Sequence, residues 1–103
     1  MGYPFVYTKT ITSSDQIFAG PGLWYGYLIG LDGANNKTIT IYDSLTASGK
    51  EIKPSQELDA TIDAENGVIL AIPVVCENGL YVEIGGDGTC ELVVLYNQKR
   101  KHM

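Results

Sequence analysis

The sequence has very little of the histidine and cysteine from which catalytic and metal sites are usually built. Its 103 residues include one histidine, His102, and two cysteines, Cys76 and Cys90. Nucleophilic catalysis of the triad type needs a histidine beside the nucleophile, and no histidine precedes residue 102. The cysteines match no zinc-binding spacing and are too few for a disulfide framework. We expect each to pack as a small apolar side chain, with a bridge between neighbouring strands left open as an alternative.

Long apolar segments and a leader-like beginning are also missing. No window approaches the roughly 18 consecutive apolar residues of a membrane span. The first ten residues lack a basic stretch followed by an apolar one, so we expect the chain to be made and to mature in a cytoplasm. With 45% hydrophobic and 18% charged residues, the composition is that of a globular protein. The length fits a single domain.

Positive charge is scarce except near the end of the chain. Residues 1–98 hold all 12 acidic residues and only four lysines, a balance of −8, whereas Lys99, Arg100 and Lys101 follow one another in the remainder. A body of this charge repels a phosphate backbone, so we expect it to bind no nucleic acid. We divide the sequence into one domain over residues 1–98 and a basic tail over residues 99–103. The tail is shorter than a typical basic motif, and we expect it to be mobile.

What the sequence does have is alternation of apolar and polar residues with a period of two, interrupted by glycine-rich breaks. This pattern is typical of half-buried β-strands. Lys9 fits an edge strand protected by charge. Segment 56–62 also fits one helical turn, but a strand is favoured because no second helix is available to pack on it. The expected strands cover residues 5–11, 16–19, 24–31, 37–43, 50–53, 56–62, 68–75, 80–84 and 89–96.

Turn signals separate these strands. The pairs Asn66-Gly67 and Asn78-Gly79 predict tight turns, and the segment Gly85–Gly88 is expected to close a hairpin. About eight short strands with turns every eight to twelve residues predict an all-β fold. We expect an antiparallel β-sandwich of jelly-roll or Greek-key type.

Acidic residues suggest two kinds of chemistry that the sequence supports poorly. A pair of carboxylates could serve a glycosidase, but so short a chain has little material for a deep cleft, and outward acids are typical of a solvated face. The loop Asp32–Asn36 has oxygen ligands but not the spacing of an EF-hand, and turn formation explains it without an ion. We therefore expect no enzyme activity, no metal and no cofactor. The acids weighed as catalytic pairs are Asp43, Glu77, Glu83, Asp87 and Glu91.

Aromatic side chains are the remaining candidates for binding chemistry. Seven of the ten aromatic residues are tyrosines, a residue favoured where one end of a side chain is buried and the other is wet. Exposed rings stack on sugars or anchor a protein interface, whereas buried rings fill the core of a small sandwich. Because neighbouring strand residues point to opposite faces, at least one ring of the Trp24-Tyr25 pair belongs in the core. The candidate binding residues are Trp24, Tyr25, Tyr27, Tyr42 and Tyr81.

The segments also follow one another in a characteristic order. A Gly-Pro-Gly break precedes WYGYLIG, and TITIYDS leads into a small-residue loop ending at Gly49. An apolar strand and ENGLYVEIGGDGTCELVVLY complete the succession over residues 18–96. This order resembles a group of small virion proteins of tailed bacteriophages. The matching positions are Gly20, Asp43, Gly49, Asn78, Gly79 and Tyr81.

The resemblance implies a non-enzymatic structural protein located in the virion and made in the host cytoplasm. It would be a capsid decoration protein or an accessory subunit of the head or tail. Its partners would be copies of itself, for example in a trimer, and a viral capsid or tail protein, with Tyr25, Tyr27, Tyr42 and Tyr81 as interface anchors. No membrane partner is expected. The alternative is a carbohydrate-binding module that stacks sugars on Trp24 and on Tyr25 or Tyr27.

Overall fold

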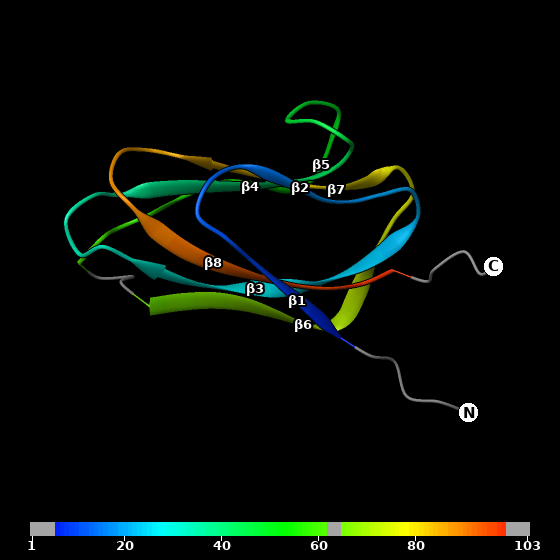
Figure 1. Cartoon of the computed structure of the whole chain (residues 1–103), viewed down its shortest axis with the longest axis horizontal. Coiled ribbons are helices and arrows are strands. Elements are labelled where there is room, and N and C mark those ends of the chain that lie inside the picture. Colours follow the sequence, from blue (N-terminus) through cyan, green and yellow to red (C-terminus); the bar gives the residue numbers. More distant parts are fainter. Residues whose placement is uncertain (1–5, 62–64, 99–103) are drawn as a thin grey trace.

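The computed structural model of the chain describes residues 6–61 and 65–98. Eight strands form two four-stranded antiparallel sheets that pack face to face (Figure 1). The expected β-sandwich is therefore confirmed. The strands are β1 (Tyr7–Ile11), β2 (Asp15–Ala19), β3 (Gly22–Leu31), β4 (Lys37–Asp43), β5 (Lys50–Leu58), β6 (Glu65–Cys76), β7 (Gly79–Gly85) and β8 (Cys90–Asn97).

The strand order is that of a jelly roll. Sheet A has the order β1-β8-β3-β6, and sheet B has the order β2-β7-β4-β5. Each strand of the first half pairs with its counterpart counted from the end, β1 with β8, β2 with β7, β3 with β6 and β4 with β5. One long antiparallel ribbon is thus rolled into two layers. Figure 1 shows sheet B above sheet A, with the β4–β5 loop projecting from the upper layer.

The core lies between the two sheets and is filled by the inward positions of the alternating strands. Alternate residues of β7 and β8, namely Leu80 and Val82 on one strand and Leu92 and Val94 on the other, are fully buried, as period-two alternation requires. Each large apolar side chain buried in this way stabilises the fold by about 1.5–3 kcal/mol. The fully buried side chains of the core are Trp24, Tyr27, Ile39, Ile41, Cys76, Leu80, Val82, Leu92 and Val94.

β3 departs from strict alternation at Tyr25. The register against β8 shifts between Trp24 and Gly26, so that one extra residue forms a β-bulge. Strict alternation would place Trp24 and Tyr27 on opposite faces, yet both are buried in the core. Gly26 makes the bulge possible, because its φ is +129° and a Cβ there would lie 1.8 Å from the carbonyl oxygen of Val68.

One predicted turn is wrong, and two are confirmed as turns, although Gly85–Gly88 does not close the hairpin that was expected. Asn66 and Gly67 lie inside β6. Gly67 lets β6 lie close to β3, because a Cβ there would lie 2.7 Å from Leu28 Cδ2 and 2.9 Å from the backbone carbonyl oxygen of Tyr27. Gly85–Gly88 does not close a hairpin, because β7 and β8 belong to different sheets. Asn78-Gly79 does reverse the chain, but it joins β6 of sheet A to β7 of sheet B.

β5 is one continuous edge strand where two separate segments were expected. It runs from Lys50 to Leu58 through Pro54, a residue that an edge strand tolerates because one side of its backbone needs no partner. The helical alternative for segment 56–62 is therefore not adopted up to Leu58. Ile62 lies outside the described residues.

The two cysteines are free and buried. Cys76 pairs in register with Gly22 and Cys90 with Leu31, so they lie at opposite ends of β3. Nine residues of strand separate them by roughly 30 Å, whereas a disulfide needs Cα atoms within about 7 Å. A bridge within the chain is thus excluded, and desolvation raises the pKa of the Cys76 thiol to about 12.

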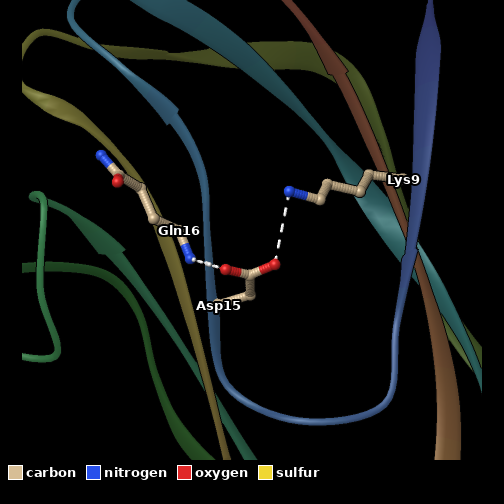
Figure 2. Close-up of polar contacts among 3 residues, drawn as sticks. All are labelled: Lys9, Asp15 and Gln16. Atoms are coloured by element: carbon tan, nitrogen blue, oxygen red, sulfur yellow. Dashed lines mark hydrogen bonds and ion pairs between the residues drawn. The ribbon is translucent and has the colours of Figure 1, made fainter.

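Polar contacts fasten the turn that carries the chain from β1 in sheet A to β2 in sheet B (Figure 2). Lys9 Nζ lies 3.3 Å from Asp15 Oδ2, and the backbone N–H of Gln16 donates to Asp15 Oδ1 at 2.8 Å. The N–H of Ile84 donates to Ser14 Oγ at 2.8 Å, which ties the turn to β7. Lys9 also places a charge on the edge strand β1, as the sequence predicted.

Candidate functional site

Trp24 and Tyr27, two of the five predicted binding residues, belong to the core. They are 2% and 1% exposed, and their stacked rings have centroids 6.5 Å apart. Trp24 Nε1 donates to the Gly26 oxygen at 3.0 Å, and Lys53 Nζ lies 5.9 Å from the centroid of the Tyr27 ring. Burial raises the pKa of the Tyr27 hydroxyl and lowers that of the Lys53 ammonium. Neither ring can reach a sugar or a partner from this position.

The other three tyrosines do not form one site. Tyr42 and Tyr81 are register neighbours on β4 and β7 of sheet B, whereas Tyr25 is the bulge residue of β3 in sheet A. Tyr42 is buried, and its hydroxyl donates to Glu83 Oε1 at 2.9 Å. This hydrogen bond raises the pKa of Tyr42. Tyr25 and Tyr81 are half-buried, so they alone of the five keep surface for a partner.

Four of the six positions that carry the sequence resemblance are joined by hydrogen bonds around the β6–β7 turn, namely Gly20, Asp43, Asn78 and Gly79. The Asp43 carboxylate is buried at the end of β4 and accepts the N–H groups of Glu77 at 3.0 Å, Asn78 at 2.8 Å and Gly79 at 3.3 Å. The Gly20 N–H donates to the Asn78 oxygen at 2.9 Å. Burial alone would raise the pKa of Asp43, but the three backbone donors lower it overall. Asp43 therefore holds the β6–β7 turn rather than a reacting group.

The opposite end of β4 is built in the same way. Lys37 is buried, and its ammonium donates to the carbonyl oxygens of Gly86 at 3.2 Å and Gly88 at 2.9 Å. The two end residues of one strand thus hold the two turns that flank β7. Asp43, which was weighed as a catalytic acid, and Lys37 both satisfy backbone groups that would otherwise lack partners.

The Asp32 loop also satisfies its own carboxylate. Asp32 accepts the N–H groups of Ala34 at 2.8 Å, Asn35 at 2.8 Å and Thr89 at 3.0 Å, and also the Asn35 amide at 3.0 Å. These hydrogen bonds, led by the one from Ala34, hold the pKa of Asp32 far below its usual range. Within residues 6–61 and 65–98, no group of three or more histidine, cysteine or acidic residues is arranged to hold a metal ion.

The surface that stands out is the apolar side of sheet A. Large apolar side chains are exposed on β3 and β6, namely Leu28 (47%), Ile69 (64%), Ile72 (82%) and Val75 (62%). The strands of sheet B expose no such side chain in the described residues. Their eight charged residues contrast with three on the strands of sheet A. Apolar exposure concentrated in this way marks an interaction surface more often than scattered single residues do.

β6 is an open edge without the usual protection. It has β3 on one side only, and no charged residue occurs from Gly67 to Cys76, a segment that we call the apolar edge. Edge strands normally carry charges or are very short, because their unpaired N–H and C=O groups attract other strands. Between the pairs Gly26–Ile69 and Trp24–Val74, four residues of β6 lie opposite Tyr25 alone. The strand therefore has an irregular segment here, and Ile72 within it is 82% exposed.

The sequence contained part of this signal. A proline within a strand is typical of an edge or a bulge, and Pro73 lies in an edge strand at a shift of register. The exposure of Ile69, Ile72 and Val75 was missed, since an apolar run looks the same whether it is buried or open. Its complete lack of charge over ten residues was the available clue.

Among known protein families and curated proteins, none matches this chain. No helix that is long and apolar enough to cross a membrane occurs in the described part of the chain.

Proposed function

We propose that this protein is a non-enzymatic structural subunit that works by assembling, with copies of itself and with a second structural protein, through the outer face of sheet A and the apolar edge. The observation that carries the proposal is the exposed and uncharged apolar edge, Gly67–Cys76 of β6. The resemblance of the sequence supports the setting, the virion of a tailed bacteriophage, where the protein would be a capsid decoration protein or a head or tail accessory subunit.

The distribution of charge supports assembly through this face. Residues 1–98 carry a balance of −8, so two copies repel each other over most of their surface. The strands of sheet A carry few charges, and copies that meet there avoid most of this repulsion. Covering Ile69, Ile72, Val75 and Leu28 would each contribute up to about 1.5–3 kcal/mol, enough together to offset much of the entropy lost on association.

Carbohydrate binding is less well supported. A stacking platform needs exposed rings, but Trp24 and Tyr27 are in the core and only Tyr25 of the three remains accessible. The fold itself does not decide, because jelly rolls occur in viral capsid proteins and in lectins. The apolar edge favours assembly, since sugar-binding sites need no uncharged strand edge.

The test is the oligomeric state, measured by light scattering and sedimentation over a wide concentration range. We expect the wild-type chain to form a discrete oligomer and Ile72→Asp to shift it toward monomer by at least tenfold in dissociation constant. Leu45→Asp is the matched control, since Leu45 is 50% exposed but lies in the β4–β5 loop. A wild-type monomer that binds a glycan array would overturn the proposal.

A further inference from the structure

None of the described residues requires glycine at position 30. Of the eleven glycines in the described residues, seven have positive φ, and three (Gly22, Gly67 and Gly85) would place a Cβ within 3 Å of another residue. Gly30 has neither property, because a Cβ there would meet no atom of the described residues within 4 Å. Glycine inside a strand destabilises it relative to residues with side chains. No described residue fills the space above Gly30, and this space is where we look for a group from another molecule.

This space is the floor of an open depression on the outer face of sheet A. The depression is lined by residues that include Leu28, Gly30, Asp32, Glu91 and Val93. In the register of β3 with β8, Gly30 lies beside Glu91 and Leu28 lies beside Val93. These four residues are therefore neighbours on the same face of sheet A. The depression is thus continuous with the apolar surface around Leu28.

The walls of the depression suit a long side chain that ends in a cation. Leu28 and Val93 offer apolar contacts to an aliphatic stem, and the bare backbone at Gly30 lets the stem lie close to the strand. The Glu91 carboxylate is exposed and makes no hydrogen bond or ion pair with another described residue. A lysine or arginine head group would supply the partner that this carboxylate lacks.

We propose that the depression binds the basic segment Lys99–Lys101 of a second copy of this chain, an inference that rests on the proposed self-assembly. These three residues are the only adjacent cations in the sequence, against a body of balance −8. They complement the rim of the depression in charge. Their long aliphatic stems complement its walls.

The segment can reach the depression of its own chain only in one extreme arrangement. Glu91 and Gln98 lie seven residues apart along β8 and its end, roughly 23 Å. Gln98 is held at that end, since its side-chain amide donates to the carbonyl oxygens of Ala19 and Pro21. The three residues from Gln98 to Lys101 span at most about 11 Å, so a contact within one chain needs the segment to fold straight back along β8 with backbone and side chains fully extended. A contact between two copies needs no such arrangement and is therefore favoured.

The geometry of such a contact is head to tail. The donor segment and the depression lie at opposite ends of β8, so each copy can give its segment to one neighbour and receive one from another. Contacts of this kind are heterologous and produce a closed ring if the rotation closes. A small closed ring satisfies every copy.

Cross-linking tests the contact directly. Full-length chain labelled with nitrogen-15 is mixed with unlabelled chain under oligomer-forming conditions and treated with a carbodiimide, which joins a carboxylate to an amine in direct contact. We expect peptides that join Glu91 of one isotope to Lys99 or Lys101 of the other. An oligomer without these peptides overturns the inference and leaves the proposed function standing. A chain that stays monomeric overturns both.

Substitutions separate docking from folding. Gly30→Val should fill the open space, leave Tm equal to or above that of the wild type, and weaken association at least tenfold. Glu91→Lys should weaken it similarly, and reversing Lys99, Arg100 and Lys101 to glutamate in the same chain should restore it. Glu51→Lys, an exposed glutamate on β5, is the control and should restore nothing when combined with the reversed segment. Unchanged association in Gly30→Val with a wild-type Tm would overturn the inference.

Discussion

β5 and β6 are the two long edge strands of the sandwich, one on each sheet, and each contains a proline. Within nine residues β5 carries Lys50, Glu51, Lys53 and Glu57, whereas β6 carries no charge from Gly67 to Cys76. Charges on an edge oppose pairing with another chain. Because the same protein protects one edge and leaves the other apolar, the exposure of β6 is not a general consequence of the fold. It is a local property that assembly would explain.

The outer faces of the two sheets differ in polarity as the two edge strands do, with sheet B more polar and sheet A more apolar. On sheet B, the polar groups find partners within the chain, as when Tyr42 donates to Glu83 across β4 and β7. On sheet A, Leu28 and Ile69 face solvent with no such compensation. Of the four predicted tyrosine anchors, Tyr42 and Tyr81 lie on sheet B, and Tyr27 on sheet A is buried. Tyr25, the half-buried residue at the β3 bulge, is the one predicted anchor that keeps accessible surface on sheet A.

The largest loss of stability is expected on substitution of Asp43, which lies beside the start of β5 and the end of β6. It pairs in register with Lys50 at the start of β5, and its carboxylate holds the turn that follows β6. Asp43→Ala would leave buried N–H groups without an acceptor, at a cost of about 1–3 kcal/mol in the free energy of unfolding. Chemical denaturation measures this loss. A cost near zero would show that the turn does not depend on the carboxylate.

The pH dependence of the free energy of unfolding gives a second test of the role of Asp43, with Asp43→Asn as the matched control. Because its folded-state pKa is lowered, ionised Asp43 contributes stability that is present above the unfolded pKa of about 4 and is lost as the pH falls through the folded pKa. Asp43→Asn keeps an acceptor oxygen but does not titrate. The stability difference between the wild type and Asp43→Asn should therefore shrink on acidification below pH 4, and a constant difference would contradict the assignment.

The strands of this fold could be predicted from the sequence, but their partners could not. Period-two alternation located β7 and β8 and their buried residues, since each inward position has to be apolar whichever strand lies beside it. Gly85–Gly88 signalled a turn correctly but not that β8 joins the other sheet. The bulge at Tyr25 was also invisible, because it is set by the register against β8, a strand more than 60 residues away.

The candidate site was less predictable than the fold. Trp24 and Tyr27 were chosen for their residue type, which does not reveal on which side of a bulged strand a ring lies. The apolar edge was recognised as a strand, but its exposure depends on its place at the end of the order β1-β8-β3-β6. The open space above Gly30 could not be predicted from the sequence. The sequence does not tell a glycine that the backbone conformation requires from one that only leaves space for another group.

Removing the protection of β5 should give an intermediate effect. Glu51→Val with Glu57→Val takes two exposed carboxylates from this edge and makes it resemble β6. In an Ile72→Asp background, where assembly through β6 is weakened, we expect the apparent mass in sedimentation to rise with concentration, with association at least tenfold tighter than in Ile72→Asp alone. If the triple variant stays monomeric, charge is not what distinguishes the two edges. Ser55→Val, an exposed position on β5 without charge, controls for added apolar surface.

The smallest effect on stability and association is expected at the short edge strand β1. Its one charged residue, Lys9, forms an ion pair with Asp15, whereas β5 carries four charged residues. The side chains of Lys9 and Asp15 are 41% and 46% exposed, and solvent screens pairs of this kind to a contribution of about 0–1 kcal/mol. A double-mutant cycle with Lys9→Met and Asp15→Asn should give a coupling energy below about 0.5 kcal/mol, which 1 M salt removes. Lys9→Met should also leave the oligomeric state unchanged, since five residues offer little edge for another strand. A coupling above about 1 kcal/mol, or new association, would mean that one charge on a short edge protects it as strongly as four protect β5.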